Sequence, residues 1–152
     1  TATFTFDGGT VAPASLNVTD LTVSGQTVTP AQPGPTPTPE VGASRLELTK
    51  TVENTTQGTG ETETLNQAKP GDFLTYRIYY RNTGTGPITD LNIDDTTPPY
   101  TGFVNGSNVC DVTPSGMGCT PSAVLDELDW SFTGSLQGGA NGHVSYEVRV
   151  DN

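Results

Sequence analysis

The chain has 152 residues, of which 15% are charged and 32% are apolar, and its net charge at pH 7 is −11. Its 18 glycines, 12 prolines and 27 threonines disfavour helix, because Gly is too flexible, Pro lacks an N–H donor and Thr is β-branched. The negative surface would repel nucleic acid and anionic membranes, and no apolar run approaches the roughly 18 residues of a membrane-spanning helix. We therefore expect an all-β protein with no nucleic-acid partner and no membrane insertion.

Residues 1–29 form short strand-like runs without any Lys or Arg. The runs alternate apolar and polar residues, and the turn residues Asp7, Gly8 and Gly9 separate the first two. About thirty residues of strand bury too little surface to be stable alone, so their apolar faces need another surface. We interpret 1–29 as an N-terminal strand extension that could insert into a neighbouring subunit. Its anchors would be the apolar side chains of Phe4, Phe6, Leu16 and Val18.

Residues 30–44 are the clearest boundary in the chain. Five prolines fall between Pro30 and Pro39, which favours an extended polyproline II spacer. At about 3.1 Å per residue, such a spacer could span roughly 40 Å. The sequence thus predicts an extension at 1–29, a Pro-rich linker at 30–44 and a folded domain at 45–152.

Residues 45–152 show the period-two alternation of strands that bury one face. Turn signals rich in Gly, Pro, Asn and Thr separate the runs. We expect strands, or groups of short strands, at 46–52, 73–82, 88–95, 103–104, 124–132 and 143–150. Six or seven short strands at this spacing predict a β-sandwich.

Within this domain, short motifs occur in an order that resembles a known family. They are LTKTV at 48–52, PGDFLTY at 70–76, YRNTGTGP at 80–87, IDDTTP at 93–98 and the final strand at 142–150. Residues 45–152 resemble the bacterial and archaeal surface-repeat module called "domain of unknown function 11". The resemblance implies an immunoglobulin-like β-sandwich in extracellular or cell-surface proteins, usually in tandem copies. It implies no enzymatic activity. This chain departs from the pattern in having one copy, an N-terminal extension and a cysteine-bounded loop.

The chain has two cysteines, Cys110 and Cys119, which enclose a Gly- and Pro-containing loop. We expect them to form a disulfide in an oxidising compartment, and closing ten residues would contribute about 2.5–3 kcal/mol in the chain-entropy view. The alternative is a pair of reduced, partly buried thiols. A zinc site lacks ligands, because there are no further cysteines and only one histidine. We expect no cofactor.

Three polar residues share faces with apolar strand residues. By period two, Lys50 lies with the leucines of 46–52, Asp95 with the apolar residues of 88–95, and Asn152 with the valines of 143–150. One interpretation is a buried Lys50–Asp95 ion pair, or a lysine whose amine reaches water at the end of a sheet. The other is an isopeptide bond, in which a desolvated Lys50 amine attacks an Asn side-chain amide while a carboxyl shuttles protons. Asn152 would be the partner, with Asn82 in reserve.

No catalytic signature emerges from the sequence, and we expect no enzyme. Nucleophile elbows, phosphate-binding loops and dinucleotide fingerprints are absent, and Asp94 and Asp95 point to opposite faces of a strand. Acidic clusters could attract Ca²⁺, but they lack the spacing of a calcium loop, and we assign no metal. N-glycosylation sequons begin at Asn17, Asn54 and Asn105.

These features favour a structural subunit of an extracellular filament or pilus. The subunit would polymerise head-to-tail with copies of itself by donating N-terminal strands to its neighbour. The alternative is a stalk or ligand-binding module of a large cell-surface adhesin or surface-layer protein. In either case the expected location is extracellular or at the cell surface.

Overall fold

The computed structural model describes residues 21–23, 26–28, 42–64 and 67–152. The chain divides into two compact units, Thr1–Glu40 and Val41–Asn152. In the first unit, β1 (Leu21–Val23) and β2 (Gln26–Val28) pair as an antiparallel hairpin. The predicted anchors Phe4, Phe6, Leu16 and Val18 lie outside the described residues.

The second unit consists of strands joined by turns and loops. Its strands are β3 (Leu46–Asn54), β4 (Phe73–Asn82), β5 (Ile88–Thr89), β6 (Asn92–Thr96), β7 (Thr101–Phe103), β8 (Val109–Val112), β9 (Gly118–Val124), β10 (Glu127–Thr133), β11 (Ser135–Leu136) and β12 (Asn141–Val150). Every pairing among them is antiparallel. The described residues contain no helix, which confirms the all-β prediction and means that no described helix could cross a membrane.

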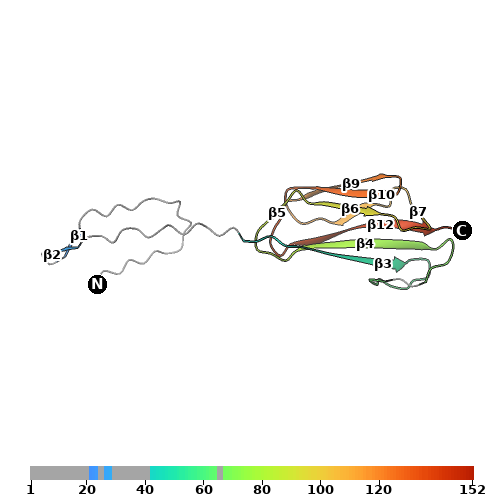
Figure 1. Ribbon diagram of the computed structural model, residues 1–152, viewed down its shortest axis with the longest axis horizontal. Helices are drawn as coiled ribbons and strands as arrows, with labels where there is room; N and C mark the ends of the chain where they lie inside the picture. Colours follow the sequence, from blue (N-terminus) through green and yellow to red (C-terminus); the bar gives the residue numbers. More distant parts are fainter. Residues whose placement is uncertain (1–20, 24–25, 29–41, 65–66) are drawn as a thin grey trace. The chain divides into compact units, whose positions relative to one another are not determined.

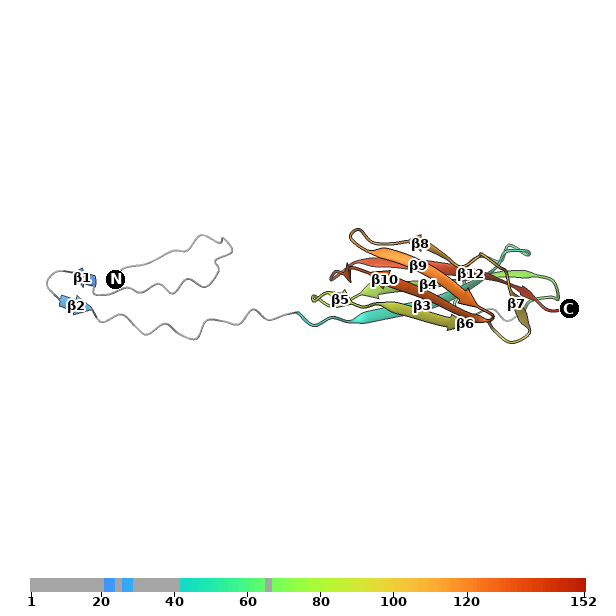
Figure 2. The same cartoon turned by 90° about the horizontal axis from the view of Figure 1, so that it is seen from above.

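Two layers of sheet face each other in this unit (Figures 1 and 2). The larger sheet has the order β3-β4-β12-β7, and β8 also pairs with β12. The smaller sheet has the order β6-β10-β9, and the short strands β5 and β11 pair with each other. Strands β3 and β6 therefore form free edges of the two sheets, while the long strands β4, β12 and β10 occupy the interior positions.

The core lies between the inner faces of the two sheets. The period-two pattern of β4 and β12 places their buried residues on the same side, because register pairs such as Ile78 with Val144 lie directly opposite each other. Aromatic contacts join the layers: the Trp130 and Tyr146 rings are 6.1 Å apart, and Tyr80 meets Phe132 edge-on at 5.1 Å. The buried apolar residues are Val52, Leu74, Ile78, Tyr80, Leu91, Ile93, Leu128, Trp130, Phe132, Leu136, Val144, Tyr146 and Val148.

Two predicted strand runs are each interrupted by a residue in the left-handed backbone region. Asp90, at φ 55°, ends β5 and starts the bend that leads to β6, so the run 88–95 is not continuous. Leu125, at φ 58°, forms the turn of the β9–β10 hairpin inside the run 124–132. Leucine rarely adopts this conformation, so nothing in the local sequence marks the turn.

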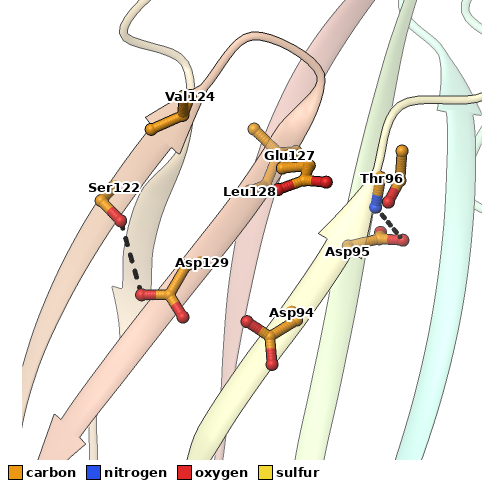
Figure 3. Close-up of a pocket in the computed structure, with 8 residues that line it drawn as sticks. All are labelled: Asp94, Asp95, Thr96, Ser122, Val124, Glu127, Leu128 and Asp129. Carbon is orange, nitrogen blue, oxygen red and sulfur yellow. Dashed lines mark hydrogen bonds between the residues drawn. The ribbon is translucent and has the colours of Figure 1, made fainter.

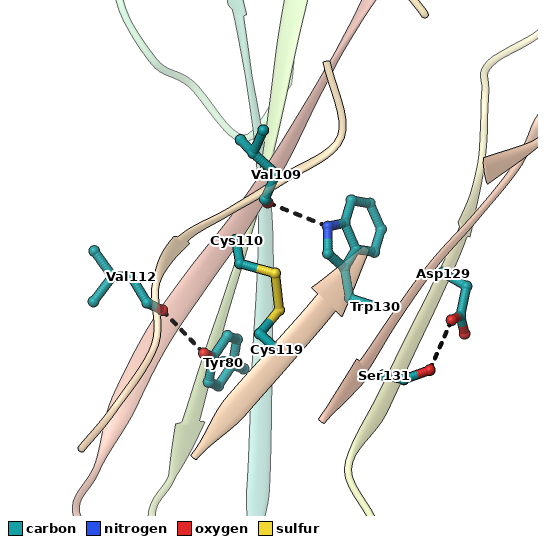
Figure 4. The surroundings of a disulfide bond; sticks show 8 residues. All are labelled: Tyr80, Val109, Cys110, Val112, Cys119, Asp129, Trp130 and Ser131. Carbon is teal, nitrogen blue, oxygen red and sulfur yellow. Dashed lines mark hydrogen bonds between the residues drawn. A yellow bond between two sulfur atoms is a disulfide. The ribbon is translucent and has the colours of Figure 1, made fainter. Parts of the chain in front are cut away.

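The disulfide between Cys110 and Cys119 joins the two sheets. Cys110 lies on β8, which pairs with β12, and Cys119 lies on β9, which pairs with β10; their Cα atoms are 6.2 Å apart. Figure 4 shows the bond beside two side chains that hold β8 from within the core. Trp130 Nε1 donates to Val109 O at 3.2 Å, and the Tyr80 hydroxyl donates to Val112 O at 3.0 Å. The disulfide that the sequence predicts is therefore present, although it bridges strands rather than closing a plain loop.

Candidate functional site at the free edge of strand β3

The backbone of β3 alternates between pairing with β4 and facing away from it. The amide of Thr83 donates to Arg45 O at 2.8 Å, so Arg45 and every second residue after it face β4. Val52 is in the opposite phase and exchanges hydrogen bonds of 2.7 and 2.9 Å with Thr62 on the far side. The short segment around Thr62 thus covers the second half of this edge.

The first half of the same edge is open. By the alternation that Val52 fixes, Leu46, Leu48 and Lys50 also direct their N–H and C=O groups away from β4. Across 42–64 and 67–152, no backbone group pairs with these three residues on that side. The open edge, 46–50, is therefore a row of free donors and acceptors that another strand could pair with.

The side chains of these three residues point toward the inner face of the sheet. They share this direction with Val52 and Asn54, which are buried, but Leu46 is 39% exposed and Leu48 is 52% exposed. Nothing in 42–64 or 67–152 thus covers the interior of the sandwich at this corner. Two exposed leucines beside an unpaired strand edge form an apolar surface of the kind that binds another segment.

Lys50 and Asp95 connect the edges of the two sheets. The Lys50 Nζ lies 2.5 Å from Asp95 Oδ2, so β3 is tied to β6 at this point. The same ammonium lies 4.8 Å from the Tyr76 ring centroid and 5.5 Å from that of Tyr146, two rings that stack on each other. The structure therefore contains the ion pair between Lys50 and Asp95. It also places the rings of Tyr76 and Tyr146 beside the lysine, which the period-two pattern of the sequence did not predict.

Lys50 is not buried, which contradicts the buried form of the ion pair and fits the alternative of an amine that reaches water at the sheet edge. Its side chain is 39% exposed and that of Asp95 is 17% exposed, because no strand among the described residues pairs with the outer edge of β3 at this point. A pair this accessible contributes about 1 kcal/mol or less to stability. Burial, together with the charge of Asp95, raises the pKa values of Tyr146 and Tyr76, so both phenols stay neutral over the physiological range.

Neither predicted asparagine partner lies near Lys50. Asn82 pairs with Leu46, four residues from Lys50 along β3, which is about 13 Å in a strand. Asn152 is exposed beyond the end of β12, eight residues past Val144, which lies level with Lys50 across the sheet. It therefore does not share the buried face of the valines of β12. Within the part of the chain that the structure describes, the hydrogen-bonding partner of the Lys50 amine is the carboxylate of Asp95.

The intact mass distinguishes the ion pair from a crosslink. We expect a mass about 2 Da below the sequence mass, because the disulfide removes two hydrogens and nothing else is lost. Alkylation without reduction should label neither cysteine. A further loss of about 17 Da, the mass of ammonia, that disappears in Lys50→Arg would demonstrate the amide crosslink instead. Two labelled cysteines would contradict the disulfide.

The three sequons have different surroundings. Asn17 lies outside the described residues, and Asn105 is exposed in a turn. Asn54 is fully buried: its Nδ2 donates to Asp72 Oδ2 at 2.8 Å, and its Oδ1 accepts from the Gln57 amide at 3.0 Å. Asn54 is therefore a structural residue that cannot carry a glycan in the folded protein, and the sequon there is incidental.

Asp72 gives the fold a predictable response to acid. Hydrogen bonds from the Lys69 amide and the Asn54 side chain hold the pKa of Asp72 below its usual value near 4. Because the pKa of Asp72 is lower in the folded state than in the unfolded state, the ionised carboxylate stabilises the fold at any pH above the unfolded pKa. This stabilisation is lost as the pH falls from the unfolded pKa through the folded pKa. We expect the thermal midpoint of the wild type to fall more steeply below about pH 4 than that of Asp72→Asn. The exposed Asp151→Asn is the matched control, and equal slopes for wild type and Asp72→Asn would contradict the assignment.

An open acidic pocket lies on the outer side of the smaller sheet (Figure 3). Asp94 and Asp129 are register partners there, and Asn92 Nδ2 bridges them, at 2.7 Å from Asp129 Oδ2 and 3.2 Å from both Asp94 oxygens. The bonds from Asn92 and Ser131 lower the pKa of Asp129, so this carboxylate stays ionised at neutral pH. Asp94 and Asp95 point to opposite faces, as their adjacency predicts. The amide group of Asn92 donates hydrogen bonds to both side chains and so offsets part of the cost of placing them side by side.

The chain matches no protein-family model and no curated protein. The likeness of 45–152 to the surface-repeat module therefore stays a prediction from its motifs. The site consists of a strand edge that no described residue pairs with, two exposed leucines and an ion pair. Sequence parity had placed Leu46 and Leu48 on the buried face. The turn-like composition of 53–64 did not indicate that the segment around Thr62 would pair with the second half of β3 and not with the first.

Proposed function

We propose that this chain is a structural subunit of an extracellular filament or pilus, assembled head-to-tail by donation of an N-terminal strand to the next subunit. The observation that carries the proposal is the incomplete edge of the larger sheet, where Leu46 and Leu48 lie exposed on an inward face. A sheet with such an edge gains stability when a strand from elsewhere pairs with it. In the same chain, residues 1–29 supply strand-like runs whose apolar faces need a surface.

Head-to-tail geometry follows from the separation of donor and acceptor. The donor would be in the unit Thr1–Glu40 and the acceptor in the unit Val41–Asn152, so each copy carries one of each. Such a heterologous contact uses two different patches and can repeat without closing, which produces an open polymer. The Pro-rich residues 30–39 favour an extended connection between the two.

The proposed extracellular location is supported by the covalent chemistry of the fold. A disulfide between the two sheets indicates a non-reducing compartment. The low charge content of the strands, together with many threonines, suits a protein that packs against copies of itself. We propose that it acts without a cofactor and without enzymatic turnover.

Deletion of residues 1–29 tests this function. We expect the shortened protein to keep the circular dichroism spectrum of a β-sandwich and to stay monomeric by light scattering, whereas the full chain forms polymers visible by electron microscopy. The reason is that the deletion removes the donor and leaves the acceptor strand in place. A folded, shortened protein that still forms long filaments would disprove donation by this segment. A full chain that is monomeric at every concentration would disprove the filament itself.

A further inference from the structure

We propose that the open edge, 46–50, is the acceptor for residues 1–6 of a second copy of this chain. This inference rests on the proposed function and goes beyond it by naming both members of the joint. The contact would pair backbone groups of Leu46, Leu48 and Lys50 with the incoming strand. It would also cover the two exposed leucines with apolar side chains.

The length and limits of the open edge fit one short strand. The edge starts where Arg45 turns its carbonyl to Thr83, and it ends at Val52, where the bridge to Thr62 begins. Five residues of strand span about 17 Å, and the six residues 1–6 span about 20 Å. An incoming strand would therefore occupy the gap without displacing the segment that already covers the second half of β3.

The chemistry of residues 1–6 matches the two faces that such a strand would have. In TATFTF, Ala2, Phe4 and Phe6 fall on one face, and threonines fall on the other. With the apolar face inward, the two phenylalanines would meet Leu46 and Leu48, and the threonines would face solvent. Strands β1 and β2 already pair with each other, so we assign the donor role to earlier residues.

Charge favours this donor over a random strand. Residues 1–39 contain no Lys or Arg, and their only charged side chains are Asp7 and Asp20. Arg45 directly precedes the open edge, and Lys50, which pairs with Asp95, is its last residue. Asp7 directly follows Phe6, so antiparallel docking of 1–6 would bring its carboxylate to the end of the edge where Arg45 lies. Five prolines between Pro30 and Pro39 favour an extended spacer between the donor and β3, and such a spacer suits delivery of the strand to a second copy.

Two full-length variants separate the donor from the acceptor. Leu46→Glu/Leu48→Glu places two charges on the open edge, where exposed side chains tolerate substitution, and Phe4→Glu/Phe6→Glu does the same to the donor. We expect each variant alone to be folded and monomeric. An equimolar mixture should form a complex of twice the monomer mass by light scattering, because one variant can still donate and the other can still accept. Val124→Glu/Leu125→Glu, which charges two exposed residues on β9 and its turn, is the matched control and should polymerise like the wild type.

The outcomes distinguish this inference from the proposed function. If deletion of 1–29 abolishes polymers but Leu46→Glu/Leu48→Glu still forms them, the filament stands and the acceptor is wrong. If the edge variant is monomeric but Phe4→Glu/Phe6→Glu polymerises, the donor is wrong. If the mixture of the two variants stays monomeric, the strand docks within its own chain or not at all, and exchange between copies is disproved.

Discussion

Replacing Trp130 by alanine should destabilise the fold by about 3–5 kcal/mol, the largest effect that we expect from a single substitution. Trp130 is completely buried on β10, at the centre of the contact between the two sheets. Its ring packs 6.1 Å from that of Tyr146, and its Nε1 donates to Val109 O, so truncation creates a cavity and also leaves a carbonyl without its donor. Trp130 is the only tryptophan, so its replacement removes the tryptophan fluorescence signal. The free energy of unfolding should therefore be measured in denaturant by circular dichroism.

Two further variants divide this loss into its parts. Trp130→Phe keeps an aromatic ring but cannot donate to Val109 O, so its deficit should be clearly smaller than that of the alanine variant. Leu125→Ala is the control for loss of apolar volume at an exposed position, where the side chain is 87% exposed, and it should change stability by less than about 0.5 kcal/mol. A Trp130→Ala deficit as small as that of Leu125→Ala would mean that the two sheets do not meet at this side chain.

The inner faces of the long strands could be predicted from sequence because they obey a local rule. In β4 and β12, apolar residues recur at every second position, and both strands have neighbours on either side that keep this alternation in register. Ile78 and Val144, for example, are buried at facing positions, as period two requires. The disulfide could be predicted for a related reason, since only two cysteines are available in the chain.

The features that could not be predicted depend on where a sheet ends. Period two places Leu48 and Lys50 on the inner face, but only the three-dimensional structure shows that nothing among the described residues covers that face at the edge of β3. The turns at Asp90 and Leu125 are imposed by the packing of the strands around them rather than by local preference. Asn54 illustrates the same limit. Its Thr-rich neighbours suggest an exposed position, but it is buried because it bonds to Asp72, which lies 18 residues away in the sequence.

Asn82→Ala should cost about 3 kcal/mol, because Asn82 uses its whole hydrogen-bonding capacity inside the protein. Its Nδ2 donates to Gly86 O at 2.7 Å and to Leu136 O at 2.9 Å. Its Oδ1 accepts from the amides of Arg45, at 3.2 Å, and Gly84, at 3.0 Å. One side chain thus joins the start of β3, the turn after β4 and strand β11. Alanine would leave buried carbonyls without donors, whereas the exposed Asn105→Ala should be nearly neutral in the same denaturant measurement.

Asn82→Asp makes the same prediction sensitive to pH. An aspartate keeps the two bonds that Oδ1 accepts but places a second oxygen against Gly86 O and Leu136 O, so burial and repulsion raise the pKa of the new carboxyl above its unfolded value near 4. A raised folded-state pKa means that this variant is most stable below the unfolded pKa and loses stability as pH rises through the folded one. The deficit of Asn82→Asp relative to the wild type should therefore shrink as pH falls from about 7 to about 4, while that of Asn82→Ala stays constant. Parallel pH profiles for the two variants would show that the donor bonds of Asn82 do not hold the two carbonyls together.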